Sequence, residues 1–119
     1  MKHIEYQIKQ YRMSRYVPGD VLLVPLPHEG GPAKVRPAIV IATQPGGNLC
    51  LFPIRSNPRV GATCIPISID DFEEGGLDLF SESYVQTDTV RIVKSGLVIG
   101  KKGHVTRDFL VRIGKGNPQ

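Results

Sequence analysis

The stretch that decides the fold is GDVLLVPLPHEGGPAKVRPAIVIA, residues 19–42. It holds two runs rich in Val, Leu and Ile, Asp20–Leu26 and Arg36–Ala42, which are typical of β-strands. The residues between these runs are polar or flexible and include His28, Glu29, Gly30, Gly31 and Lys34. A plain hairpin needs only a tight turn. We therefore expect Pro27–Val35 to be a polar, mobile loop with a function of its own.

The rest of the chain repeats this pattern of short apolar runs. Thirteen glycines and ten prolines separate runs of β-branched and apolar residues, which indicates an all-β barrel or sandwich. Further strands are expected at Leu49–Arg55, Thr63–Ile69, Ser83–Val93 and Leu97–Lys101. Three prolines lie inside the expected strands and remove amide donors there: Pro25, Pro53 and Pro66. A small, strongly bent barrel tolerates such gaps better than a flat sheet.

Helical signals are few. One helical turn is expected over Asp70–Glu74, capped by Asp70 and stopped by the two glycines that follow. A short helix is expected over Asp108–Ile113, capped by Thr106 and ended by Gly114. We divide the chain into an N-terminal extension at residues 1–17, whose pattern fits either a strand or a helix, a barrel domain at 18–114 and a frayed tail at 115–119.

Length and composition limit the class of protein. A chain of 119 residues suits a single domain with a core of its own. Fifteen Lys and Arg against eleven Asp and Glu leave a net charge of +4, which favours an anionic partner. Cys50 and Cys64 are expected to be buried free thiols in a reducing cytoplasm rather than a disulfide. No signal peptide and no run long enough to cross a membrane is visible.

Four pieces, in this order and spacing, resemble the MazF/PemK family, the toxin half of type II toxin–antitoxin pairs. They are Pro18-Gly19-Asp20-Val21, the polar loop, the segment from Arg36 to Ile41, and the segment from Ser83 to Arg91. The resemblance covers about residues 18–100. It implies a small SH3-like β-barrel with one or two short helices, usually present as a homodimer. It also implies a metal-independent endoribonuclease that cuts single-stranded RNA at short sequences and needs no cofactor.

The resemblance further implies partners. The expected partner is an antitoxin whose acidic, disordered tail lies across the RNA groove, and the pair together would bind operator DNA. No membrane partner is expected. Cutting RNA without a metal requires a base for the 2′-OH proton, an acid for the departing 5′-oxygen and a cation for the phosphorane. The products would carry a 2′,3′-cyclic phosphate and a 5′-OH.

Three residues are the candidates for this chemistry. His28 is a natural proton shuttle near neutral pH, and the PemK-like branch carries a matching His-Glu pair. Arg36 would clamp the scissile phosphate, because a guanidinium stays protonated and cannot act as a base. Asp88 matches an aspartate that takes part in proton transfer in that branch, and an apolar, partly closed site would raise its pKa. Each also has a structural alternative: a solvent-exposed loop histidine, a strand-end arginine and a loop-tethering aspartate.

A second group is expected to bind RNA, and it consists of Lys34, Arg55, Ser56, Gln86 and Arg91. Three positions depart from the family pattern. Arg55 stands where MazF-like members have threonine, Gln86 where the PemK-like branch has arginine, and Thr89 where that branch has glutamine. Arg55 would then supply, from another strand, the charge that is missing at Gln86. In an extended strand Arg91 lies on the opposite face from Asp88 unless a bulge intervenes.

Two other functions remain open from the sequence. A non-catalytic barrel that grips nucleic acid or a protein tail would need the same basic groove without a paired acid and base. A gyrase-poisoning toxin shares this barrel architecture in other families. A cleavage assay in EDTA and a supercoiling assay separate these alternatives from a ribonuclease.

Overall fold

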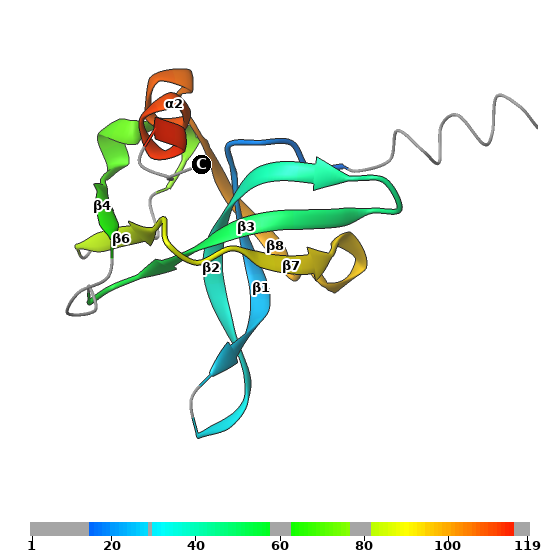
Figure 1. The fold of residues 1–119 in the computed structure, drawn as a ribbon. Helices are drawn as coiled ribbons and strands as arrows, with labels where there is room; N and C mark the ends of the chain where they lie inside the picture. Colours follow the sequence, from blue (N-terminus) through cyan, green and yellow to red (C-terminus); the bar gives the residue numbers. More distant parts are fainter. Residues whose placement is uncertain (1–14, 29, 58–62, 77–81, 116–119) are drawn as a thin grey trace, which may run out of the picture.

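The computed structural model describes residues 15–28, 30–57, 63–76 and 82–115. In these ranges the chain is mainly β, and its strands form one strongly curled sheet with a single α-helix at one end (Figure 1). The prediction of a small, mainly β, barrel-like domain is confirmed. The expected extension up to residue 14, Glu29 and residues 116–119 of the expected tail lie outside the described residues.

Eight strands are found in the described ranges. They are β1 (Asp20–His28), β2 (Gly31–Gln44), β3 (Asn48–Arg55), β4 (Cys64–Ile67), β5 (Phe72–Gly75), β6 (Ser83–Gln86), β7 (Arg91–Lys94) and β8 (Gly100–Val105). Their order in the sheet is β4-β6-β3-β2-β1-β8-β5, and β7 also pairs with β3. Short 3₁₀ turns lie at η1 (Ile69–Asp71) and η2 (Ser95–Leu97), and the helix is α2 (Arg107–Lys115).

β1 and β2 form a longer hairpin than the sequence predicted. Their pairing continues through Leu26↔Lys34 to His28↔Gly31, with an irregularity just before the tip. Gly30 has a φ of +79°, a left-handed conformation that glycine adopts without strain in a tight turn. The prediction of a loop over Pro27–Val35 is therefore wrong, because the tight turn lets the strands pair almost to the end. The hairpin extends away from the rest of the sheet (Figure 1).

The outer edge of β3 changes partner part-way along. β7 pairs with Asn48–Leu51 and β6 pairs with Ile54–Arg55. The single strand predicted over Ser83–Val93 is therefore two strands. Pro53 lies in the gap and has no N–H to donate, which favours a change of partner at this point. Residues 87–90 leave the sheet at this point as a turn.

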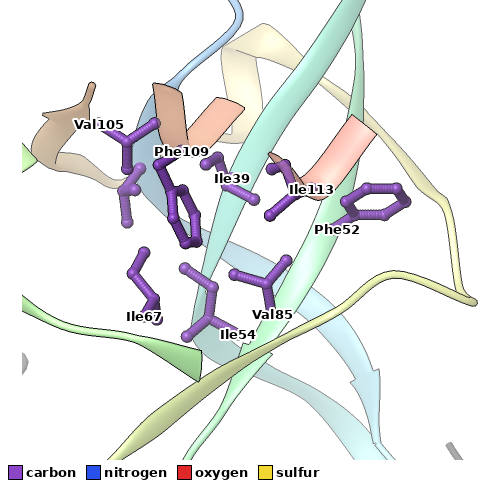
Figure 2. Packing of buried hydrophobic residues seen from close by; sticks show 9 residues of the cluster. Ile39, Phe52, Ile54, Ile67, Val85, Val105, Phe109 and Ile113 are labelled. Atoms are coloured by element: carbon purple, nitrogen blue, oxygen red, sulfur yellow. The ribbon is translucent and has the colours of Figure 1, made fainter. Parts of the chain in front are cut away.

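The sheet buries apolar side chains on both faces. The first core contains Val21, Ile39, Phe52, Ile54, Ile67, Val85, Val105, Phe109 and Ile113 (Figure 2). The second core contains Leu22, Val24, Leu26, Ala38, Val40, Leu49, Leu51 and Val93. Neighbouring residues of one strand belong to opposite cores, as the two-residue period of a strand requires. The position of a residue along its strand therefore tells which face it occupies.

Helix α2 closes the first core, and its prediction is confirmed. The Thr106 hydroxyl accepts a hydrogen bond from the Phe109 amide at 3.2 Å, so Thr106 caps the helix as expected. Phe109 and Ile113 lie four residues apart and are both buried. Gly114 does not end the helix, which continues to Lys115.

The helical turn predicted over Asp70–Glu74 is wrong. The 3₁₀ turn η1 ends at Asp71, and its cap is Ser68, whose amide donates to the Asp71 carboxylate at 2.9 Å. The next residues form strand β5, in which Phe72 pairs with Val105 of β8 and packs against the first core. Pairing and burial of Phe72 outweigh the local helical preference of the acidic residues.

Gly19 and Asp20 lie at the start of β1, where the charged Asp20 side chain is buried. Asp20 is 1% exposed, and its Oδ1 lies 2.7 Å from His104 Nδ1 and 3.2 Å from Lys101 Nζ. Desolvation lowers the pKa of Lys101, but its hydrogen bonds to Glu74 and Asp20 outweigh this effect and raise it. A Cβ at Gly19, which has a φ of +101°, would lie 2.9 Å from the His104 ring. Packing around a satisfied buried carboxylate therefore explains this motif.

Two expectations from composition can be compared with the structure. Cys50 and Cys64 are free thiols, as predicted, but both are half-buried rather than fully buried. In the described part of the chain, no helix has the length and apolarity to cross a membrane.

Candidate functional site

One face of the sheet gathers the cations that the sequence singled out. Residues paired across a ladder point to the same side of a sheet. Lys34 and Arg36 of β2 pair with Leu26 and Val24 of β1, which belong to the second core. Lys34 and Arg36 therefore lie on the face that carries the second core.

Arg55 lies on the same face. Pro53 of β3 pairs with Ala38 of the second core, and Arg55 follows Pro53 by two residues. Arg36 precedes Ala38 by two residues in the antiparallel strand, so Arg36 and Arg55 occupy corresponding positions on neighbouring strands. Both are half-buried, and no described carboxylate forms an ion pair with either. A bound anion would neutralise both guanidinium groups.

Arg91 completes this group of cations, since it pairs with Leu51 of the second core. We call Lys34, Arg36, Arg55 and Arg91 the cationic face. A groove of about 520 Å³ lies between Pro25–Pro27 of β1 and the segment Val90–Lys94. Its lining is mostly apolar, and Arg91 and Lys94 add two cations to it. The face therefore offers both positive charge and an apolar hollow.

Asp88 lies on the turn between β6 and β7, and its side chain is exposed. Its Oδ2 accepts a hydrogen bond from the Thr63 amide at 3.3 Å, and its Oδ1 accepts one from the Thr89 hydroxyl at 3.1 Å. Partial desolvation raises the pKa of Asp88, but hydrogen bonds from Gln86, Thr63 and Thr89 outweigh it and hold that pKa below its ordinary value.

The raised pKa expected for Asp88 is therefore wrong. The carboxyl group lies at the surface and is held by hydrogen-bond donors, whereas a raised value would need an apolar, closed pocket. Asp88 is ionised at neutral pH. Arg91 is not on the same strand as Asp88, because the turn at residues 87–90 separates β6 from β7.

Gln86 is buried, with only 3% of its surface exposed. Its Nε2 donates a hydrogen bond to the Thr89 hydroxyl at 3.0 Å, while its Oε1 has no hydrogen-bond partner among the described residues. The expectation that Gln86 contacts RNA directly does not fit this buried position. Its side chain instead supports the neighbouring surface residues Thr89 and Asp88.

Two further candidates, His28 and Ser56, are placed by the ends of their strands. His28 ends β1, and its backbone pairs with Gly31 near the hairpin tip. Its side chain lies outside the described part of the chain, as does Glu29. Ser56 follows β3 and is exposed. Among the described residues, no hydrogen bond or ion pair joins Asp88 to the cationic face, and no three His, Cys, Asp or Glu side chains gather to hold a metal ion.

Sequence reasoning missed the two residues that hold Asp88. Thr89 stands out in the sequence only as a departure from the family pattern, although a hydroxyl next to a carboxylate is itself a signal of local hydrogen bonding. Thr63 gives no such signal, because it is 25 residues from Asp88. Only the pairing of β4 with β6 brings the two together.

Comparison with known proteins decides the family. A sequence profile described as PemK-like, MazF-like toxin of type II toxin-antitoxin system matches residues 17–116. The chain belongs to this family. The resemblance seen in the sequence is confirmed, and the match covers the barrel, the hairpin and helix α2 of this PemK/MazF-like toxin. A search of curated protein sequences gives no significant match.

Solved structures show that MazF-like proteins share this fold. The Mycobacterium tuberculosis toxin MazF-mt6 superposes with a TM-score of 0.60 at 15% identity, covering 82% of this chain and 90% of that one. An endoribonuclease from mycobacterial species gives 0.54 at 13% identity, with 85% and 86% covered. A chain of the MazE-MazF crystal structure from Deinococcus radiodurans gives 0.53 at 19% identity, with 84% and 92% covered.

Proposed function

We propose that this PemK/MazF-like toxin is a metal-independent endoribonuclease that cuts single-stranded RNA and leaves 2′,3′-cyclic phosphate and 5′-OH ends. The observation that carries the proposal is the pair Arg36 and Arg55, which each lie two residues beyond the Ala38–Pro53 pair on the cationic face and have no described carboxylate to neutralise them. Family membership and the endoribonuclease among the structural neighbours support the same activity.

Arg36 and Arg55 bind the scissile phosphate of the RNA. A guanidinium fork presents two parallel N–H donors to two phosphate oxygens, and it remains charged at any physiological pH. Arg36 holds the scissile phosphate, and Arg55 adds the second positive charge that a phosphorane needs. Lys34 and Arg91 extend the contact along the RNA backbone, since both are exposed on the same face. Ser56 lies beside Arg55 and donates to a further phosphate oxygen.

The ionised state of Asp88 decides how the proton-transfer roles are divided. A carboxylate that is ionised at neutral pH accepts a proton and does not donate one. We assign Asp88 to the 2′-OH, whose oxygen attacks phosphorus as its proton leaves. The bond from phosphorus to the 5′-oxygen then breaks, and His28 donates the proton that this oxygen takes up. The assignment of His28 rests on the sequence pattern and on its place at the hairpin tip.

The test is a cleavage assay with end-labelled single-stranded RNA in excess EDTA. We expect cut ends that carry a cyclic phosphate. The variant His28→Ala should bind RNA as the parent does and cut about 10²-fold more slowly or worse, which is typical of losing a proton-transfer group. A mock purification from cells that do not express the protein controls for contaminating nucleases. RNA binding without cleavage would favour the binding-module alternative, and an effect on supercoiling would favour a gyrase poison.

We also propose that the toxin is a homodimer that meets through β7 and η2. Four large apolar side chains on this stretch are about half exposed or more, and they are Val90, Ile92, Leu97 and Ile99. In the described part of the sheet, β7 pairs only with β3, so its other edge is open to a second copy. Large apolar side chains that are exposed close together in the chain are typical of protein interfaces.

We expect light scattering to report a dimer for the parent and a monomer for Ile92→Asp, because a carboxylate would be buried unpaired at the interface. The matched control is Val111→Asp, which places the same charge at an exposed apolar residue on α2. A monomeric parent at micromolar concentration would contradict the proposal, and so would dissociation by both variants alike.

An antitoxin is the proposed protein partner. The MazE–MazF neighbour supports a partner of this kind. An acidic, disordered tail would lie on the cationic face and compete with RNA, because both ligands offer anions to the same arginines.

A further inference from the structure

Three side chains at the end of β6 form a chain of hydrogen bonds that leads from the interior to the surface. Gln86 Nε2 lies 3.0 Å from Thr89 Oγ1, and Thr89 Oγ1 lies 3.1 Å from Asp88 Oδ1. Gln86 is buried, Thr89 half-buried and Asp88 exposed. The chain thus connects a buried amide to a carboxylate that faces solvent.

The direction of each hydrogen bond follows from the chemistry of the groups. An amide NH₂ can only donate, so the Thr89 oxygen must accept from Gln86. A carboxylate can only accept, so the single Thr89 hydroxyl proton must point at Asp88. A free threonine hydroxyl rotates, whereas this one has its direction set from both sides. Networks of this kind hold their members in one orientation.

The second Asp88 oxygen is also held. The Thr63 amide donates to Oδ2 at 3.3 Å. Thr63 in turn is fixed by the backbone, since its carbonyl accepts from the Thr87 amide at 3.0 Å. The groups that face the carboxylate are therefore the Thr63 amide, the Thr89 hydroxyl, the Gln86 amide and its own amide, and none of them carries a charge.

Gln86 adds a second, independent observation. Its Oε1 is buried without a hydrogen-bond partner among the described residues, which costs folding free energy. An apolar residue of similar size would avoid that cost. A buried group that destabilises the fold and orients a neighbour at a candidate site is typical of function rather than of stability.

We propose that Gln86 and Thr89 are positioning residues for Asp88. The Gln86 amide directs the Thr89 hydroxyl, and this hydroxyl with the Thr63 amide holds the Asp88 carboxylate in one orientation as the proton acceptor for the 2′-OH. This inference rests on the proposed function, because it assigns the residues that act through Asp88 in that reaction.

The experiment follows the Asp88 carboxyl carbon by NMR during a pH titration, with the parent and the variant Thr89→Val. Thr89→Val removes the hydroxyl that donates to the Asp88 carboxylate and stabilises its ionised form, so the pKa of Asp88 should rise. Activity that needs ionised Asp88 falls at acid pH, so the acid limb of the cleavage profile should move to higher pH in the variant. Cleavage at neutral pH should drop about three- to tenfold, the loss of one hydrogen bond. Thr89→Ser keeps a hydroxyl and should restore both readouts.

A second variant keeps the test independent of folding defects. Gln86→Met removes the amide together with its unpartnered Oε1, so thermal stability should be unchanged or higher. The titration of Asp88 and the cleavage profile should nevertheless move as they do in Thr89→Val. A purely structural role for Gln86 predicts the reverse, a loss of stability with an unmoved profile.

Three outcomes would decide against or for the proposal. An Asp88 titration that stays at the parent position in both variants would overturn it, even if cleavage fell, because the two residues would then contact RNA themselves. A shifted titration with a shifted acid limb would support it. If the Asp88 titration shifts in the variants but the protein cuts no RNA, the role of Gln86 and Thr89 in orienting Asp88 would stand. Only the proposed RNA cleavage reaction would then be overturned.

Discussion

Replacing Arg36 by alanine is expected to slow RNA cleavage by about two to three orders of magnitude and to weaken RNA binding. Arg36 and Arg55 occupy corresponding positions of β2 and β3 on the cationic face, two residues beyond the Ala38–Pro53 pair, and no described carboxylate neutralises either residue. Loss of one preorganised donor to a developing oxyanion lowers the rate about 10²–10³-fold. A hydrogen bond between charged groups is worth about 1.5–3 kcal/mol, which corresponds to about a 10- to 150-fold weaker Kd.

Two controls sharpen this measurement. Arg36→Lys keeps the charge but loses the planar fork, so it should bind nearly as the parent does and still cut poorly. Arg107→Ala removes a cation from the start of α2 and should change neither quantity. With four phosphate contacts, a plot of the logarithm of the RNA-binding constant against the logarithm of the salt concentration should have a slope of about −3 for single-stranded RNA. In Arg36→Ala the magnitude of this slope should fall by about 0.7. Unchanged cleavage in Arg36→Ala would show that the site lies elsewhere.

The second large effect concerns the fold. Phe109→Ala should lower the free energy of unfolding by about 3–5 kcal/mol, as is typical of truncating a buried phenylalanine. Phe109 is 1% exposed and belongs to the first core, where α2 meets the sheet (Figure 2). The Arg112 guanidinium also lies 4.9 Å from the Phe109 ring centroid, and this contact would be lost. Urea denaturation followed by circular dichroism measures the change.

The matched control for Phe109→Ala is Val111→Ala, on the exposed side of the same helix. It should change the free energy of unfolding by no more than a few tenths of a kcal/mol, because the helix propensity of alanine offsets the loss of a half-exposed side chain. Small domains have only about 5–15 kcal/mol of stability, so Phe109→Ala should leave a domain that melts at a much lower temperature. A loss under about 1 kcal/mol would mean that α2 contributes little to the core.

The local patterns of the sequence predict most of the fold. Alternating apolar residues predict β1, β2 and β3, because burial of one face selects a two-residue period whatever the strand pairs with. Thr106 predicts the start of α2 because a helix cap is satisfied within four residues of chain. The ordered motifs from Pro18 to Arg91 are enough to identify the family, since they are properties of the chain itself.

The tertiary structure decides what depends on partners distant in the sequence. The break between β6 and β7 depends on where β3 offers an edge, and the strand at β5 depends on its pairing with β8. Local hydrogen bonds from Gln86 and Thr89 lower the pKa of Asp88, and the Thr63 amide, which reaches the carboxylate only through the β4–β6 ladder, lowers it further. Sequence alone determines which side chains can do chemistry. The burial of Gln86 and the contact between Asp88 and Thr63 are set by long-range strand pairing that no local pattern contains.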